Sequence, residues 1–133
     1  MKDRCVECRS CNVQEIDIWK DIEGYEERYR ISNKGEVQYR ENNDKEWKTK
    51  AQKLIKNIKK SGQGYYYVRL AKSGKKELKS VHRLVAKTFI DNPENKETVN
   101  HKNGDTACNC VDNLEWMTQK ENNQAYENQK RNK

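Results

Sequence analysis

No run of apolar residues in this 133-residue chain approaches the length of a membrane span, and the polar amino terminus lacks the apolar stretch of a signal peptide. We therefore expect a soluble, intracellular protein. Apolar residues make up 32% of the chain and charged residues 37%, and the mean hydropathy is -1.37. With so little apolar material the core must be small, so we expect modest stability.

Proline is nearly absent, and the single one, Pro93, falls in a segment (91–97) that we predict as a loop. The apolar residues that are present gather in a few clusters anchored by aromatic side chains, such as 19–31, 65–70 and 84–90. Clustering of this kind favours several short, ordered elements over disorder. At this length the chain is one domain, or one domain with an appended module.

Acidic residues are outnumbered: 28 lysines and arginines stand against 21 acidic residues, for a formal net charge of +7. This excess favours a polyanionic partner. Many of the lysines lie in residues 45–76, where they contact phosphates or form a solvated face, and for any single lysine we favour the solvated face. The candidates for nucleic-acid contact are Lys53, Lys56, Arg69, Lys72, Lys75, Lys76 and Arg83.

Turn residues and hydrophobic periodicity predict mainly short antiparallel strands before residue 80. A turn at 33–35, a strand at 36–40, a loop at 41–52, a strand at 53–58 and a hairpin formed by 65–71 and 76–80 are expected.

The second half of the chain predicts a different succession of elements. A short helix is expected over 81–90, followed by two paired strands at 99–101 and 114–116. Thr118 and Glu121 have the spacing of a helix capping box. Of the two histidines, we expect His82 to be structural and to hydrogen-bond at the start of its helix.

The most informative segment is VNHKNGD (99–105), which is followed by further asparagines at 109, 113 and 122. Cutting a phosphodiester requires a base, a hard cation and rigid spacing between them. Histidine is a base near neutral pH, and Asn carbonyl oxygens are suitable ligands for magnesium-like ions. We therefore predict His101 as the base, with Asn100 and Asn122 holding one magnesium or manganese ion.

Neighbouring side chains of a strand point to opposite faces, so Asn100 and His101 can serve one site only where the strand bends or ends. The Asn103-Gly104 pair that follows favours a tight turn and supplies such a break.

These segments, together with VHRLVA (81–86), resemble the His-Asn-His (HNH) endonucleases, particularly the phage and intron-encoded homing type. The resemblance spans roughly 81–124. It implies His101 as general base, Asn100 and Asn122 as metal ligands, and Asn113 as the middle asparagine of the catalytic motif, which pins the loop. The fold class it implies is α+β: a small ββα-metal (His-Me finger) nuclease fold, preceded by a short-stranded antiparallel β DNA-binding region.

A second resemblance lies upstream. The segments IWKDIEGYE (18–26), YRISN (29–33) and GEV (35–37) are similar to the nuclease-associated modular motif that precedes such domains and contributes to DNA binding. The implied organisation is a cysteine-containing tail at 1–14, a β-rich DNA-binding region at 15–80 and the nuclease domain at 81–133.

The expected function is a metal-dependent DNA endonuclease or nickase, a monomer acting on double-stranded DNA in the cytoplasm of a bacterial or phage-infected cell. Many active relatives carry Asp where this chain has Asn100, so the site loses a formal negative charge. The alternative is therefore a non-catalytic DNA-binding protein on a degenerate HNH scaffold.

The five cysteines leave two interpretations open. Zinc requires four ligands, so the CxxCxxC run of Cys5, Cys8 and Cys11 forms a structural zinc site with Cys108 or Cys110, or it is a tail of reduced thiols. An intracellular location disfavours disulfides.

Overall fold

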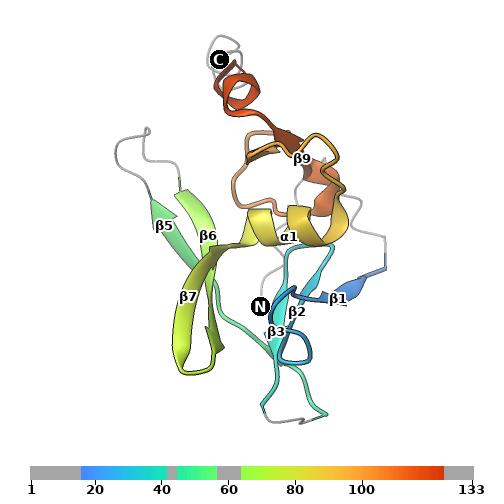
Figure 1. The fold of residues 1–133 in the computed structure, drawn as a ribbon, viewed down its shortest axis with the longest axis vertical. Coiled ribbons are helices and arrows are strands. Elements are labelled where there is room, and N and C mark those ends of the chain that lie inside the picture. The colour runs from blue at the N-terminus through green and yellow to red at the C-terminus, as the bar shows by residue number, and fades with distance from the viewer. Residues whose placement is uncertain (1–15, 42–44, 57–63, 125–133) are drawn as a thin grey trace.

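The central helix α1 (Val81–Phe89) organises the molecule, with three antiparallel sheets arranged around it (Figure 1). The computed structural model describes residues 16–41, 45–56 and 64–124. The tail at 1–14, with Cys5, Cys8 and Cys11, lies outside the described residues. The predicted α+β class is confirmed.

The first sheet contains β1 (Trp19–Asp21), β2 (Tyr29–Ser32), β3 (Val37–Tyr39) and β4 (Lys48–Thr49), in that order. The predicted turn at 33–35 connects β2 to β3, and a hydrogen bond from Gly35 N to Ser32 O closes it at 3.0 Å. The loop predicted at 41–52 is wrong at β4. The polar pair Lys48-Thr49 gains strand geometry from pairing with β3, which no local pattern predicts.

The second sheet contains β5 (Lys53–Lys56), β6 (Gly64–Lys72) and β7 (Lys75–Ser80). The predicted hairpin is confirmed, because Ser73 and Gly74 have φ values of 52° and 79° and connect β6 to β7. Positive φ at both central residues matches the twist of the flanking strands. Strand alternation buries Val68 and Leu70 against the core and turns Arg69 to the outside.

Helix α1 begins and ends within one residue of its predicted bounds. It packs against β2, β6 and β7, which precede it in the sequence, and against β8 and β9, which follow it. Its apolar residues Val81, Val85 and Ala86 are fully buried. They join Ile31 and Leu70 in a single core, so both halves of the chain share the same hydrophobic interior.

The third sheet is the hairpin of β8 (Thr98–His101) and β9 (Leu114–Met117), with the 3-10 helix η1 (Val111–Asn113) before β9. A helical segment at 119–124 follows. The predicted capping box is confirmed: Thr118 N donates to Glu121 Oε1 at 2.9 Å, and Glu121 N donates to Thr118 Oγ1 at 3.1 Å. None of the helices in the described ranges is long and apolar enough to cross a membrane.

Candidate active site

The β8–β9 hairpin positions the two central residues of the motif. In its register Asn100 lies opposite Glu115 and His101 lies opposite Leu114, so Asn100 and His101 point to opposite faces. Strand β8 ends at His101, and a turn follows in which Gly104 has a φ of 77° and its N donates to His101 O at 2.9 Å. The break that was predicted after His101 is therefore present.

Asn113 holds the loop that joins β8 to η1. Its side chain is fully buried; Oδ1 accepts from Asn103 N at 3.1 Å, and Nδ2 donates to Asn103 Oδ1 at 3.0 Å and to Cys108 O at 2.9 Å. One amide thus closes both ends of the loop. Because both the oxygen and the nitrogen of this buried amide have hydrogen-bond partners, we expect the loop to be rigid.

The His101 ring is 5% exposed, and its Nε2 lies 2.8 Å from Asn109 Oδ1. Because an amide oxygen only accepts, this contact assigns the proton to Nε2 and leaves the lone pair of a neutral ring on Nδ1. Burial lowers the pKa of His101, although the bond to Asn109 and the charge of Asp105 oppose the shift. The ring is therefore held as a neutral imidazole that can accept a proton.

Two further aromatic rings lie beside His101. His82 stacks on Tyr65 with ring centroids 4.9 Å apart, and its centroid is 5.0 Å from that of His101. Burial, followed by the neighbouring His101 and Arg83, lowers the pKa of His82 to about 3. No side-chain hydrogen bond of His82 is found among the described residues, where its ring contacts are with Tyr65 and His101. Burial disfavours the charged form of the ring, so His82 is neutral near neutral pH.

The turn at 33–35 supports the loop from the first sheet. Val111 N donates to Asn33 O at 2.8 Å, and a Cβ at Gly35 would lie 2.8 Å from Asn109 Cβ. Asn109 Nδ2 is buried without a hydrogen-bond partner in the part of the chain that the structure describes. The position of the His101 partner is thus determined by a turn more than seventy residues earlier.

The predicted metal ligands occupy two elements. Asn100, at the end of β8, donates from Nδ2 to Glu115 Oε2 at 3.0 Å. Asn122 lies in the helical segment at 119–124, half-buried, with its backbone N bonded to Thr118 O at 2.9 Å. No hydrogen bond joins its side chain to Asn100 or His101 among the residues described here, and no group of three His, Cys, Asp or Glu gathers among them.

The predicted basic residues fall into three groups. Arg83 Nη1 donates to Glu97 O at 2.8 Å and Lys72 Nζ donates to Gly24 O at 2.7 Å, so the protein itself engages both cations. Lys75 lies exposed at the hairpin end, and Lys56 lies in β5. The remaining cations, Lys53, Arg69 and Lys76, share the outer face of the second sheet, which by register also includes Tyr67 and Leu78.

A ladder of cations and aromatic rings on the first sheet was missed by the sequence analysis. The Arg30 guanidinium lies 4.7 Å from the Trp19 ring centroid and 4.4 Å from that of Trp47, and Arg40 lies 4.6 Å from Trp47. In the sequence, the only sign of this arrangement was a basic residue, Arg30, in a strand that lies between Trp19 and Trp47 along the chain. Trp47 reaches Arg30 only because residues 45–49 return to β3.

Cys108 is buried and disulfide-bonded, although an intracellular location was expected to disfavour disulfides. Cys5, Cys8 and Cys11 lie outside the described residues, so the zinc site stays a prediction. Cys110 is also buried.

Comparison with protein families matches two consecutive models to the chain. Residues 17–71 match the NUMOD4 motif, and residues 79–124 match an HNH endonuclease. The first stretch includes the first sheet, β5 and β6 up to Ala71, and the second includes α1 and the whole of the β8–β9 hairpin.

Curated relatives agree with this assignment. The chain is 42% identical over 105 residues to the DNA endonuclease I-HmuI of Bacillus phage SP01, covering 78% of this chain and 54% of that protein. It is 39% identical over 110 and 107 residues to two HNH endonucleases of Acanthamoeba polyphaga mimivirus, covering 80% of this chain and 25% and 29% of those proteins. The chain thus spans about half, or less, of the length of these relatives.

A solved structure is similar as well. The HNH homing endonuclease I-HmuI, studied for DNA binding and cleavage, has a TM-score of 0.66 and 39% identity to this chain, with 84% of this chain and 59% of that chain covered. The chain therefore carries a NUMOD4 motif at residues 17–71, ahead of an HNH endonuclease domain at residues 79–124.

Proposed function

We propose that this protein is a metal-dependent DNA endonuclease or nickase in which His101 is the general base. The observation that carries the proposal is the contact of His101 Nε2 with Asn109 Oδ1 at 2.8 Å, which leaves Nδ1 as the proton acceptor. The described cleavage of DNA by I-HmuI supports the same substrate for this chain.

His101 would take a proton from the attacking water, while Asn109 holds the ring in one tautomer. Asn113 holds the loop closed around both residues. Because this machinery is built from buried amides, the base is in place before DNA arrives, and no ordering cost is paid at the reaction step.

The residues present fit a hard divalent cation, magnesium or manganese. Asn100 Oδ1 has no hydrogen-bond partner among the described residues, and Asn122, in the helical segment that follows β9, would supply a second amide oxygen. Bound there, the ion would neutralise charge on the phosphate and on the departing oxygen. Asn100 and Asn122 would hold it.

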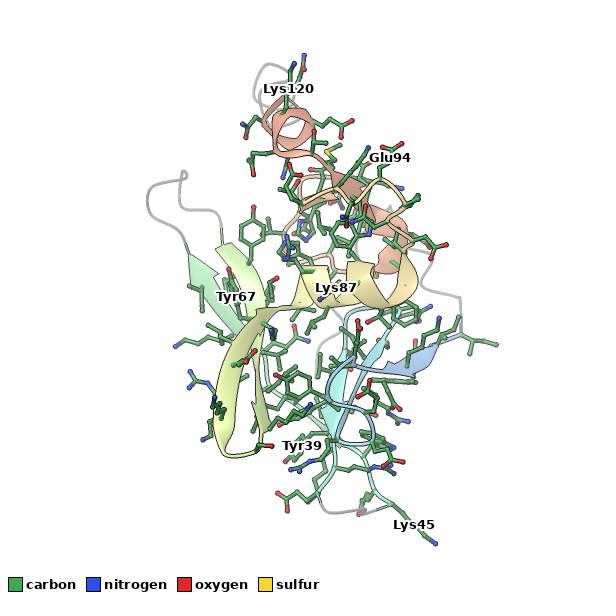
Figure 2. The ribbon with its side chains drawn as sticks, in the orientation of Figure 1. Tyr39, Lys45, Tyr67, Lys87, Glu94 and Lys120 are labelled. Atoms are coloured by element: carbon green, nitrogen blue, oxygen red, sulfur yellow. The ribbon has the colours of Figure 1, made fainter. Side chains whose placement is uncertain are left out.

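We also propose that residues 15–80 bind double-stranded DNA and residues 81–133 cut it, within the cytoplasm of a bacterial or phage-infected cell. The outer face of the second sheet suits DNA because it presents Lys53, Arg69 and Lys76 beside Tyr67 and the exposed Leu78. Figure 2 shows Tyr67 on this sheet, away from Tyr39 of the first sheet and from Lys45, which lies between β3 and β4.

A non-catalytic DNA-binding protein is the second candidate, and the neutral Asn100 favours it. Nicking of a supercoiled plasmid, measured with magnesium, with manganese and with chelator, separates the two. We expect metal-dependent nicking, and we expect His101→Ala to reduce its rate by about 100-fold to 10,000-fold. DNA affinity should hardly change, since a general base contributes mainly to the transition state. Undiminished nicking by His101→Ala would contradict the assignment of the base.

A further inference from the structure

We propose that Glu115 supplies the negative charge that Asn100 lacks, so that the divalent cation is held by a carboxylate from β9 and an amide from β8. The inference rests on the proposed function, because it concerns the ion of that site. It assigns a role to a residue that was not among the predicted ligands.

The pairing of the two strands brings the carboxylate to the site. Asn100 and Glu115 are direct cross-strand partners, so their side chains lie on the same face of the hairpin, and β8 ends one residue later, at His101. Asn100 Nδ2 donates to Glu115 Oε2 at 3.0 Å. This bond turns the amide nitrogen toward the carboxylate and leaves Asn100 Oδ1 and the second carboxylate oxygen for another partner.

No cation neutralises this carboxylate in the part of the chain that is described. Glu115 is half-buried, and its one side-chain bond there is with the neutral amide of Asn100. The nearby hollow lined by Glu115 also contains Lys96 and Lys102, but Lys96 forms its ion pairs with Glu94 and Glu121. Among the described residues this carboxylate therefore has no ion-pair partner, and one of its oxygens is left for a cation.

The chemistry of the two oxygens favours a hard divalent ion. Magnesium and manganese take carboxylate and carbonyl oxygens, and one or two carboxylates are the usual protein contribution. Two amides alone bring no charge, whereas Glu115 adds direct attraction in a partly dehydrated site. A carboxylate at Glu115 on β9, instead of one at residue 100 on β8, would preserve the negative charge of the site.

The test compares Glu115→Gln with the relocated-charge double variant Asn100→Asp/Glu115→Gln. Glutamine keeps an oxygen that accepts from Asn100, so it removes the charge while keeping the hydrogen bond. Manganese binding to the protein without DNA, followed by electron paramagnetic resonance of the free ion, is the readout. Glu46→Gln is the matched control, because Glu46 follows Lys45 at the end of the molecule far from β9 (Figures 1 and 2).

We expect Glu115→Gln to weaken manganese binding by about 10-fold to 100-fold, Glu46→Gln to leave it unchanged, and the double variant to restore it. Thermal unfolding midpoints of the variants check that each is folded. If Glu115→Gln binds manganese as wild type does, or if wild type binds none while still nicking DNA, the inference is overturned. Failure of the proposed function would give a different result: the wild type would bind manganese but would not nick a plasmid.

If Glu115 acted only by orienting Asn100, Glu115→Gln would behave as wild type and Glu115→Ala would not. That result also overturns the assignment of charge.

Discussion

The second sheet and the loop of the β8–β9 hairpin differ in how exposed their polar side chains are and in how those side chains are bonded. The outer face of the sheet exposes Lys53, Arg69 and Lys76 to solvent, without ion pairs among the described residues. The loop instead buries His101, Asn109 and Asn113, and its contacts depend on single amides. Binding through many exposed charges tolerates the loss of one, whereas a buried hydrogen-bonded loop does not.

Asn113→Ala should have the largest effect, because it removes three hydrogen bonds inside the loop. Each buried group left without a partner costs about 1–3 kcal/mol. We expect a lower free energy of unfolding in urea and loss of nicking. Asn123→Ala, at an exposed position of the helical segment, is the control and should change neither quantity. Full nicking by Asn113→Ala would show that the loop does not depend on this amide.

Gly35→Ala tests the contact that joins the first sheet to the loop. Both Gly35 and Gly74 have positive φ, and alanine there costs about 1–2 kcal/mol, but only at Gly35 would the new Cβ meet Asn109, at 2.8 Å. At Gly74 no atom lies within 4 Å. We expect both variants to lose stability and only Gly35→Ala to lose nicking as well. Equal nicking rates for the two variants would show that the turn at 33–35 does not influence the active site.

His82→Phe tests the buried ring beside His101. In the folded protein the pKa of His82 falls to about 3, below the ordinary value of 6.5, so between these pH values the unfolded chain binds the extra proton. Stability is therefore complete above pH 6.5 and declines as the pH falls, by about 1.4 kcal/mol per pH unit for one such group. Phenylalanine keeps a ring but does not titrate. We expect thermal unfolding midpoints of His82→Phe to depend less on pH than those of wild type, and parallel curves would contradict this.

Arg69→Ala should have the smallest effect, because it removes one of several exposed cations on the sheet. If Arg69 contacts a phosphate, the slope of the logarithm of the binding constant against the logarithm of salt concentration should fall by about 1. Fluorescence anisotropy with a DNA duplex measures this slope. Lys45→Ala, in the connection between β3 and β4, controls for the loss of one charge. An unchanged slope for Arg69→Ala would remove this residue from the interface.

Elements with local signals were predicted closely. The β6–β7 hairpin follows from Ser73-Gly74, helix α1 from the periodicity of its apolar residues, and the capping box from Thr118 and Glu121. In each case the residues that make the contact lie within a few positions of one another. Strand β4 was not predicted because two residues carry too little local signal, and Lys48 and Thr49 pair with residues nine and eleven positions earlier.

The sequence by itself determined the family-bearing motif, the break after His101 and the excess of basic residues, since all three depend on residue type and near spacing. Only the tertiary structure decided that Asn109 meets His101, that Gly35 supports Asn109, and that Glu115 faces Asn100. These contacts depend on strand register and on the packing of separate elements around one core. No local pattern along the chain specifies which distant side chains that packing brings within hydrogen-bond distance.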